Sequence, residues 1–128
     1  MSLLARFEIT PYYGQIEMRD PNARDYPQWE TGEEKALAMP GCIAVATQDD
    51  LHGKVTVEVW RGCLEVRGSN LVRVYQGELI LAGEAAAVGN TVGAEFHPVT
   101  LSLGRHRVTA FTAASGELPD RVYFLIED

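Results

Sequence analysis

The sequence KVTVEVWR at residues 54–61 decides the fold class. Valine takes every second position from 55 to 59, while Thr56, Glu58 and Trp60 take the alternate positions. Side chains along a β-strand point alternately to the two faces of a sheet, so the pattern predicts one apolar face and one polar face. This stretch therefore indicates a half-buried antiparallel strand.

Similar runs recur along most of the chain, separated by short breaks rich in Gly, Asp, Asn and Ser. The predicted strands occupy residues 3–10, 12–20, 42–47, 54–61, 63–67, 71–76, 78–82, 92–101, 105–113 and 121–127. Breaks such as Gln76-Gly77 carry turn chemistry, and the nearly continuous apolar run at 121–127 favours a central strand. The pattern predicts one domain over residues 1–128, an all-β, two-layer antiparallel β-sandwich of about eight strands.

Residues 20–41 differ from the rest because they are rich in proline and charge. Acidic residues at the start of 30–39 favour a short helix through the helix dipole, and Pro40 would end it. Gly32 opposes helix formation. We expect a long irregular loop here, with room for one or two helical turns.

The charge balance argues against two classes of partner. The 128 residues include 11 Lys+Arg and 18 Asp+Glu, a formal net charge of −7. Nucleic acid and anionic membrane surfaces both attract basic proteins and repel acidic ones at long range. We therefore expect neither nucleic acid nor a membrane as the partner.

The location is expected to be cytoplasmic. No stretch approaches the roughly 20 apolar residues of a membrane-spanning helix. The first residues reach charge at Arg6 and Glu8, too early for the apolar core of a signal peptide. Cys42 and Cys63 fit a reducing compartment as small buried apolar side chains.

The sequence carries none of the common catalytic or cofactor motifs: no Gly-x-Gly-x-x-Gly, no phosphate-binding loop, no His-Glu-x-x-His and no Cys-x-x-Cys. Three widely spaced histidines, His52, His97 and His106, do not indicate a metal site, which needs three or four converging ligands. The adjacent Asp49 and Asp50 fit turn residues better than a calcium site. We predict no catalytic residue, no cofactor and no metal.

Both tryptophans admit two interpretations. Trp60 lies on the polar face of its predicted strand, where either the 20–41 loop or a bulge covers it, or it forms part of a binding surface. Trp29 lies in the polar loop, where a tryptophan most often anchors the loop to the domain. With the acidic Glu33 and Glu34 of the same loop, these residues are the candidate partner-binding set: Trp29, Glu33, Glu34 and Trp60.

The N-terminal third resembles the competence protein J family. The opening strands FEITPYYGQIEMRD at 7–20 place an aromatic residue and a glutamine in a short strand that ends at an aspartate. The resemblance continues through Trp29, the acidic 33–34, the segment ALAMPG at 36–41 and an apolar strand ending at Thr47. The strand VTLSLGRHRV at 99–108 also resembles that family, whereas 61–95 contributes nothing to the likeness.

The resemblance implies a small non-catalytic β protein that inhibits the nuclease acting in DNA uptake by competent bacteria. An acidic surface suits that role, because it complements a basic nucleic-acid groove and speeds encounter. We therefore expect a small acidic intracellular binding protein with a protein partner, in its specific form an inhibitor of a nuclease or an immunity protein against one. Two alternatives stay open: a carbohydrate- or small-ligand-binding sandwich that uses Trp29, Trp60 or Tyr12 as stacking platforms, and an enzyme whose site matches no motif.

Overall fold

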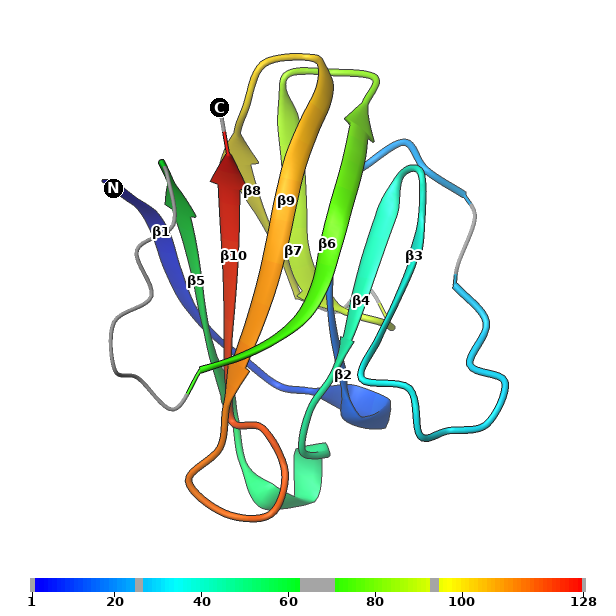
Figure 1. Ribbon diagram of the computed structural model, residues 1–128, viewed down its shortest axis with the longest axis vertical. Helices are drawn as coiled ribbons and strands as arrows, with labels where there is room; N and C mark the ends of the chain where they lie inside the picture. The colour runs from blue at the N-terminus through cyan, green and yellow to red at the C-terminus, as the bar shows by residue number, and fades with distance from the viewer. Residues whose placement is uncertain (1, 25–26, 63–70, 93–94, 128) are drawn as a thin grey trace.

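The computed structural model describes residues 2–24, 27–62, 71–92 and 95–127, and it folds them into two five-stranded sheets packed face to face (Figure 1). Sheet 1 contains, in spatial order, β1 (Ser2–Ile9), β5 (Val55–Arg61), β10 (Arg121–Glu127), β9 (Gly104–Ala113) and β6 (Val72–Leu81). Sheet 2 contains β3 (Ala36–Met39), β4 (Cys42–Ala46), β2 (Gln15–Arg19), β7 (Ala85–Asn90) and β8 (Phe96–Thr100). Two short 3₁₀ turns, η1 (Tyr12–Gly14) and η2 (Asp50–His52), lie at one end. The predicted all-β sandwich is confirmed.

The side chains of β5 alternate between a buried and a partly exposed face, as the sequence predicts. Its three valines are fully buried, and Thr56, Glu58 and Trp60 are partly exposed on the outer face. β5 pairs antiparallel with β1 but parallel with β10, so sheet 1 is not purely antiparallel. Antiparallel neighbours arise readily from hairpins, whereas β5 and β10 are far apart in the sequence and no hairpin constrains their direction. The run at 121–127 does take the central place in sheet 1.

The core lies between the two sheets and draws on both. Its largest fully buried apolar side chains are Phe124, Ile9, Ile16, Met18, Ile43, Leu79, Leu81, Leu101 and Ile126. Burial of this contiguous apolar cluster is the main stabilising contribution to such a sandwich. No helix in the described ranges is long and apolar enough to cross a membrane.

The described residues of the loop after β2 are irregular as expected as far as residue 35, but the short helix that 30–39 could form is replaced by a strand at its end. Residues 36–39 form β3, which pairs antiparallel with β4 and directs Ala36 and Ala38 toward the core. Met39 pairs with Cys42, so Pro40 and Gly41 make the two-residue turn between β3 and β4. The strand pairing and the partial burial of two alanines override a weak helical preference.

Other strand boundaries also differ from the sequence prediction. The predicted strands 71–76 and 78–82 are one strand, β6, which pairs with β9 on both sides of Gly77. A Cβ at Gly77 would overlap the Tyr75 phenol oxygen. β7 was not predicted, since its sequence AAAVGN is rich in small residues. The predicted strands 12–20 and 92–101 are shorter, at 15–19 and 96–100. The strand predicted at 63–67 and Cys63 lie outside the described residues.

Candidate partner-binding site

The loop after β2 lies against the outer face of sheet 2 and buries charged side chains there. Glu17 and Arg19 point away from the core, yet they are only 1% and 4% exposed. They form an ion pair with 3.1 Å between Arg19 Nη1 and Glu17 Oε1. Arg19 Nη2 also donates to the carbonyl of Ala23, 3.2 Å away, which attaches the loop to the strand.

Burial dominates the electrostatics of this pair. Loss of hydration raises the pKa of Glu17, although the Arg19 charge and hydrogen bonds from Thr91 and Arg19 act in the opposite direction. Cys42, paired in register with Arg19, is fully buried, and burial raises the pKa of its thiol to about 12. A thiol in that state is a poor nucleophile, as the apolar sequence around Cys42 indicates.

Trp29 anchors the loop. Its indole Nε1–H donates to Gln15 Oε1 on β2, so the ring lies beside the outer face of sheet 2. A hollow of about 210 Å³, here called the Trp29 hollow, is lined by Trp29, Gln15, Glu34 and Ala46. The interpretation of Trp29 as a loop anchor agrees with this geometry.

The two candidate glutamates have different surroundings. Glu34 accepts hydrogen bonds from the Thr31 backbone N–H at 2.8 Å, the Thr31 hydroxyl, and the Glu30 N–H at 3.1 Å. These bonds, the Thr31 hydroxyl first, lower the pKa of Glu34 and close the turn at 30–34. Glu33 precedes it in the sequence and is exposed.

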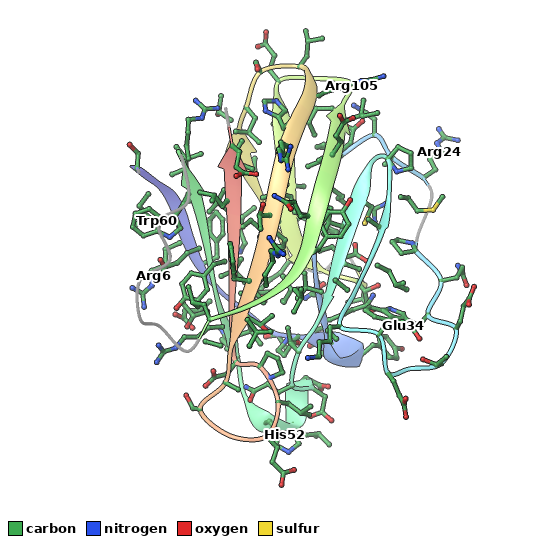
Figure 2. The ribbon with its side chains drawn as sticks, viewed as in Figure 1. Arg6, Arg24, Glu34, His52, Trp60 and Arg105 are labelled. Carbon is green, nitrogen blue, oxygen red and sulfur yellow. The ribbon has the colours of Figure 1, made fainter. Side chains whose placement is uncertain are left out.

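Trp60 lies on the other sheet. Its Nε1–H donates to Glu58 Oε1 at 2.8 Å, and Glu58 lies 3.9 Å from Arg6. Its register partner is Leu3, next to an irregularity in β1 between Leu3 and Ala5, so a bulge and not the 20–41 loop adjoins it. Figure 2 shows Trp60 and Glu34 on opposite sides of the molecule. The structure therefore brings Trp29 and Glu34 together around one hollow, with Glu33 next to Glu34 in the sequence, and leaves Trp60 apart.

The sequence prediction missed Tyr13. It lies in η1, where its backbone takes φ 59° and ψ 19°, and its side chain is 81% exposed. Tyr13 borders the Trp29 hollow and also a second hollow of about 620 Å³, which Tyr12, Asp49, Asp50 and Val92 line. The sequence analysis placed Tyr12-Tyr13-Gly14 at the start of the predicted strand 12–20, whereas the structure has them in a turn before β2.

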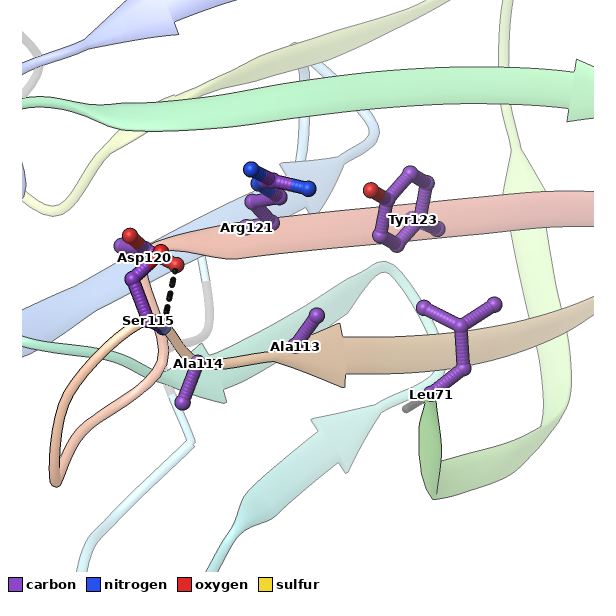
Figure 3. A pocket seen from close by; sticks show the side chains of 7 residues that line it. All are labelled: Leu71, Ala113, Ala114, Ser115, Asp120, Arg121 and Tyr123. Atoms are coloured by element: carbon purple, nitrogen blue, oxygen red, sulfur yellow. Dashed lines mark hydrogen bonds between the residues drawn. The ribbon is translucent and has the colours of Figure 1, made fainter. Parts of the chain in front are cut away.

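A third hollow, of about 290 Å³, opens on sheet 1 and gathers none of the candidate residues (Figure 3). It lies beside Arg121 and Tyr123 of β10 and Ala113 of β9. Asp120 Oδ1 accepts from the Ser115 N–H at 3.2 Å and closes the loop between those strands. This hollow is thus bounded by a structural turn.

The described part of the chain gives little support to metal binding or to the stacking of sugars on aromatic side chains. It holds no group of three or more His, Cys, Asp and Glu side chains placed to bind a metal ion. The three histidines lie apart: His52 bonds Asp49, His97 stacks on Phe7, and His106 bonds the Ser102 carbonyl. Trp29 lies in the loop beside sheet 2 and Trp60 in β5 of sheet 1, so they do not form the flat pair that a stacking platform for sugars would use.

The fold has a solved counterpart. The structure matches the crystal structure of ComJ from Bacillus subtilis, described as an inhibitor of the DNA-degrading activity of NucA, with a TM-score of 0.79. The match covers 98% of this chain and 96% of ComJ at 14% sequence identity, so it shows a shared fold. No protein-family model matches the sequence, and no curated protein is significantly similar to it.

Proposed function

We propose that this protein binds and inhibits a DNA-degrading nuclease. The observation that carries the proposal is the ComJ fold, which extends over nearly the whole of both chains without a large insertion in either. ComJ is described as an inhibitor and not as an enzyme. A shared fold by itself does not transfer function, so the proposal also draws on charge and on the site.

The net charge of −7 supports a basic partner. A nuclease binds the phosphates of DNA through Lys and Arg, and an acidic inhibitor is attracted to the same field. Such steering raises the association rate and makes it sensitive to salt. The partner is therefore a protein, with neither nucleic acid nor a membrane bound by this chain.

The binding site we propose is the edge where Trp29 fixes the loop. Glu34 is held in place by its turn, and Glu33 lies exposed beside it, so two carboxylates are presented by an ordered segment. Ordering before binding reduces the entropy lost in the complex. We place this interaction in the cytoplasm, where the free thiol of Cys42 is compatible with a reducing environment.

The test is inhibition of DNA degradation by purified nucleases. The panel contains NucA of Bacillus subtilis and the nucleases encoded in the genome from which this chain comes, with ComJ as the positive control for NucA. We expect inhibition of at least one nuclease at a molar ratio near one. If this protein inhibits none of them while ComJ inhibits NucA, the proposal is wrong.

A further inference from the structure

Tyr13 stands out from the surface as an aromatic side chain without cover. It is 81% exposed and sits on a ridge between the Trp29 hollow and the hollow at Asp49 and Asp50. Leu51 of η2, at the same end of the molecule, is 87% exposed. Exposed tyrosine flanked by hollows is typical of a residue that anchors a protein interface.

The backbone that carries Tyr13 is held firmly. The Gly14 N–H donates to the Pro11 carbonyl at 2.9 Å, and the Gly14 carbonyl accepts from the Thr47 N–H at 2.8 Å. Tyr13 itself has a positive φ, a left-handed conformation that is costly for an aromatic residue. A side chain kept exposed at that cost suggests selection for something other than stability.

The charges around this tyrosine are mostly negative. Asp49 and Asp50 line one hollow beside it, and Glu34 lines the other. The positively charged side chains near this end include Lys54, which lowers the pKa of Glu95, and Lys35, which follows Glu34 and whose carbonyl accepts from the Ala46 N–H. On the outer face of sheet 1, by contrast, arginines and glutamates pair with each other, as in Arg105–Glu78 and Arg107–Glu127.

We propose that the end of the molecule formed by η1 and η2, which carries Tyr13, enters the substrate groove of the nuclease and takes the place of DNA there. The Tyr13 ring occupies the position of a base, which aromatic and arginine side chains stack against in single-strand-binding grooves. The carboxylates of Asp49, Asp50 and Glu34 occupy the positions of phosphates, which the groove's Lys and Arg bind. Inhibition is therefore competitive with DNA. This inference rests on the proposed function and adds the surface and the mode of inhibition.

The variant that tests it is Tyr13→Asn. Asparagine tolerates a positive φ, so the change removes the ring and preserves the backbone. Tyr13→Phe retains the ring and serves as the conservative variant. Leu103→Asn is the matched control, because Leu103 is also an exposed apolar residue (64%) but lies in the connection between β8 and β9, at the opposite end of the molecule.

The experiment measures initial rates of DNA cleavage at several DNA concentrations, with a nuclease from the panel that the unmodified protein inhibits. We expect the inhibitor to raise KM and leave kcat unchanged. Tyr13→Asn should weaken inhibition about tenfold or more, as for an interface hot spot, while Tyr13→Phe and Leu103→Asn retain it. A fall in kcat at constant KM, or full inhibition by Tyr13→Asn, overturns this inference and leaves the proposed function standing. Inhibition of no nuclease at all removes the proposed function itself.

Discussion

Glu17 and Arg19 lie two residues apart on β2 and form a buried 3.1 Å ion pair on the outer face of sheet 2, where Arg19 also bonds the Ala23 carbonyl of the following loop. A strand presents residues i and i+2 on the same face, so their proximity follows from the strand itself. Their burial follows from the loop, which Arg19 reaches at Ala23 and Trp29 ties to Gln15. The position of the loop after β2 and the burial of the Glu17 and Arg19 side chains therefore depend on each other.

The stability of the protein should depend on the protonation of Glu17. Because burial raises its pKa in the folded state, the folded protein binds the proton more tightly than the unfolded chain. The stabilisation that comes from this tighter proton binding is complete below the pKa of a glutamate in the unfolded chain. It is lost as pH rises through the raised pKa of Glu17 in the folded protein. Over this pH range the free energy of unfolding of the unmodified protein should fall relative to that of Glu17→Gln. The fall should be about 1.4 kcal/mol for each unit by which the pKa in the folded state exceeds that in the unfolded state.

Urea unfolding of both proteins between acid and neutral pH measures this difference. Other carboxylates, such as Glu34 and Asp49, whose pKa values are lowered, are present in both proteins and cancel. A difference that is independent of pH, or that favours the unmodified protein as pH rises, would show that Glu17 is not held in the environment described here.

Arg19→Met should destabilise the fold strongly. It leaves the Glu17 carboxylate buried without its cation and removes the hydrogen bond to Ala23, at a cost of about 3–5 kcal/mol. The double variant Glu17→Leu/Arg19→Met should recover much of that loss, since apolar replacements of a buried pair are often tolerated. Chemical unfolding measures the free energy of unfolding of the single and the double variant. A double variant no more stable than the single one contradicts the pairing argument.

Tyr13→Asn should raise the free energy of unfolding by about 1 kcal/mol, because asparagine adopts the left-handed conformation with less strain than tyrosine. Tyr12→Asn is the control, since the backbone of Tyr12 does not have a positive φ. Urea unfolding at neutral pH distinguishes the two. Equal effects at both positions would mean that the strain at Tyr13 is absent.

Charge reversal at Glu33 should slow association with the nuclease and flatten its dependence on salt. Glu33 is exposed, so Glu33→Lys should leave the fold intact. Glu84→Lys, an exposed position in the connection between β6 and β7, makes the same change in net charge away from the site. Stopped-flow association rates at several salt concentrations compare them. Identical rates for both variants would exclude the loop from the interface.

Trp60→Ala should lower stability by about 2 kcal/mol without weakening inhibition. Trp60 is half-buried on the sheet opposite to Trp29 and bonds Glu58. Its truncation removes packing against the outer face of sheet 1, which for a partly covered tryptophan costs less than in a core. Thermal unfolding and the nuclease assay report the two properties separately. Lost inhibition at unchanged stability would place the interface on sheet 1 instead.

Alternation made the sandwich predictable, because β5 carries large apolar side chains at every second position. β3 and β7 lack that contrast: alanines make up half of each strand, and their strand conformation comes from pairing with β4 and β2. The direction of β10 beside β5 could not be predicted either, since alternation identifies faces but not neighbours.

The sequence singled out Trp29, Glu33 and Glu34 as partner-binding residues, and that role stays a prediction. The structure places Trp29 and Glu34 around one hollow. The sequence pattern explains this proximity only in part. It gave no reason to expect Tyr13 beside them, because the exposure of a turn residue depends on how two distant turns, η1 and η2, come together. The burial of Glu17 was hidden for the same reason, as its strand face appears polar until a loop covers it.

The place of β10 between β5 and β9 has a consequence for biosynthesis. Until Arg121–Glu127 has left the ribosome, sheet 1 consists of two separate ribbons, β1 with β5 and β9 with β6, whose facing edges expose unpaired backbone groups. Completion of sheet 1 therefore requires β10 to insert between two ribbons formed by earlier parts of the chain, and until it does so their facing edges are open to pairing with other chains.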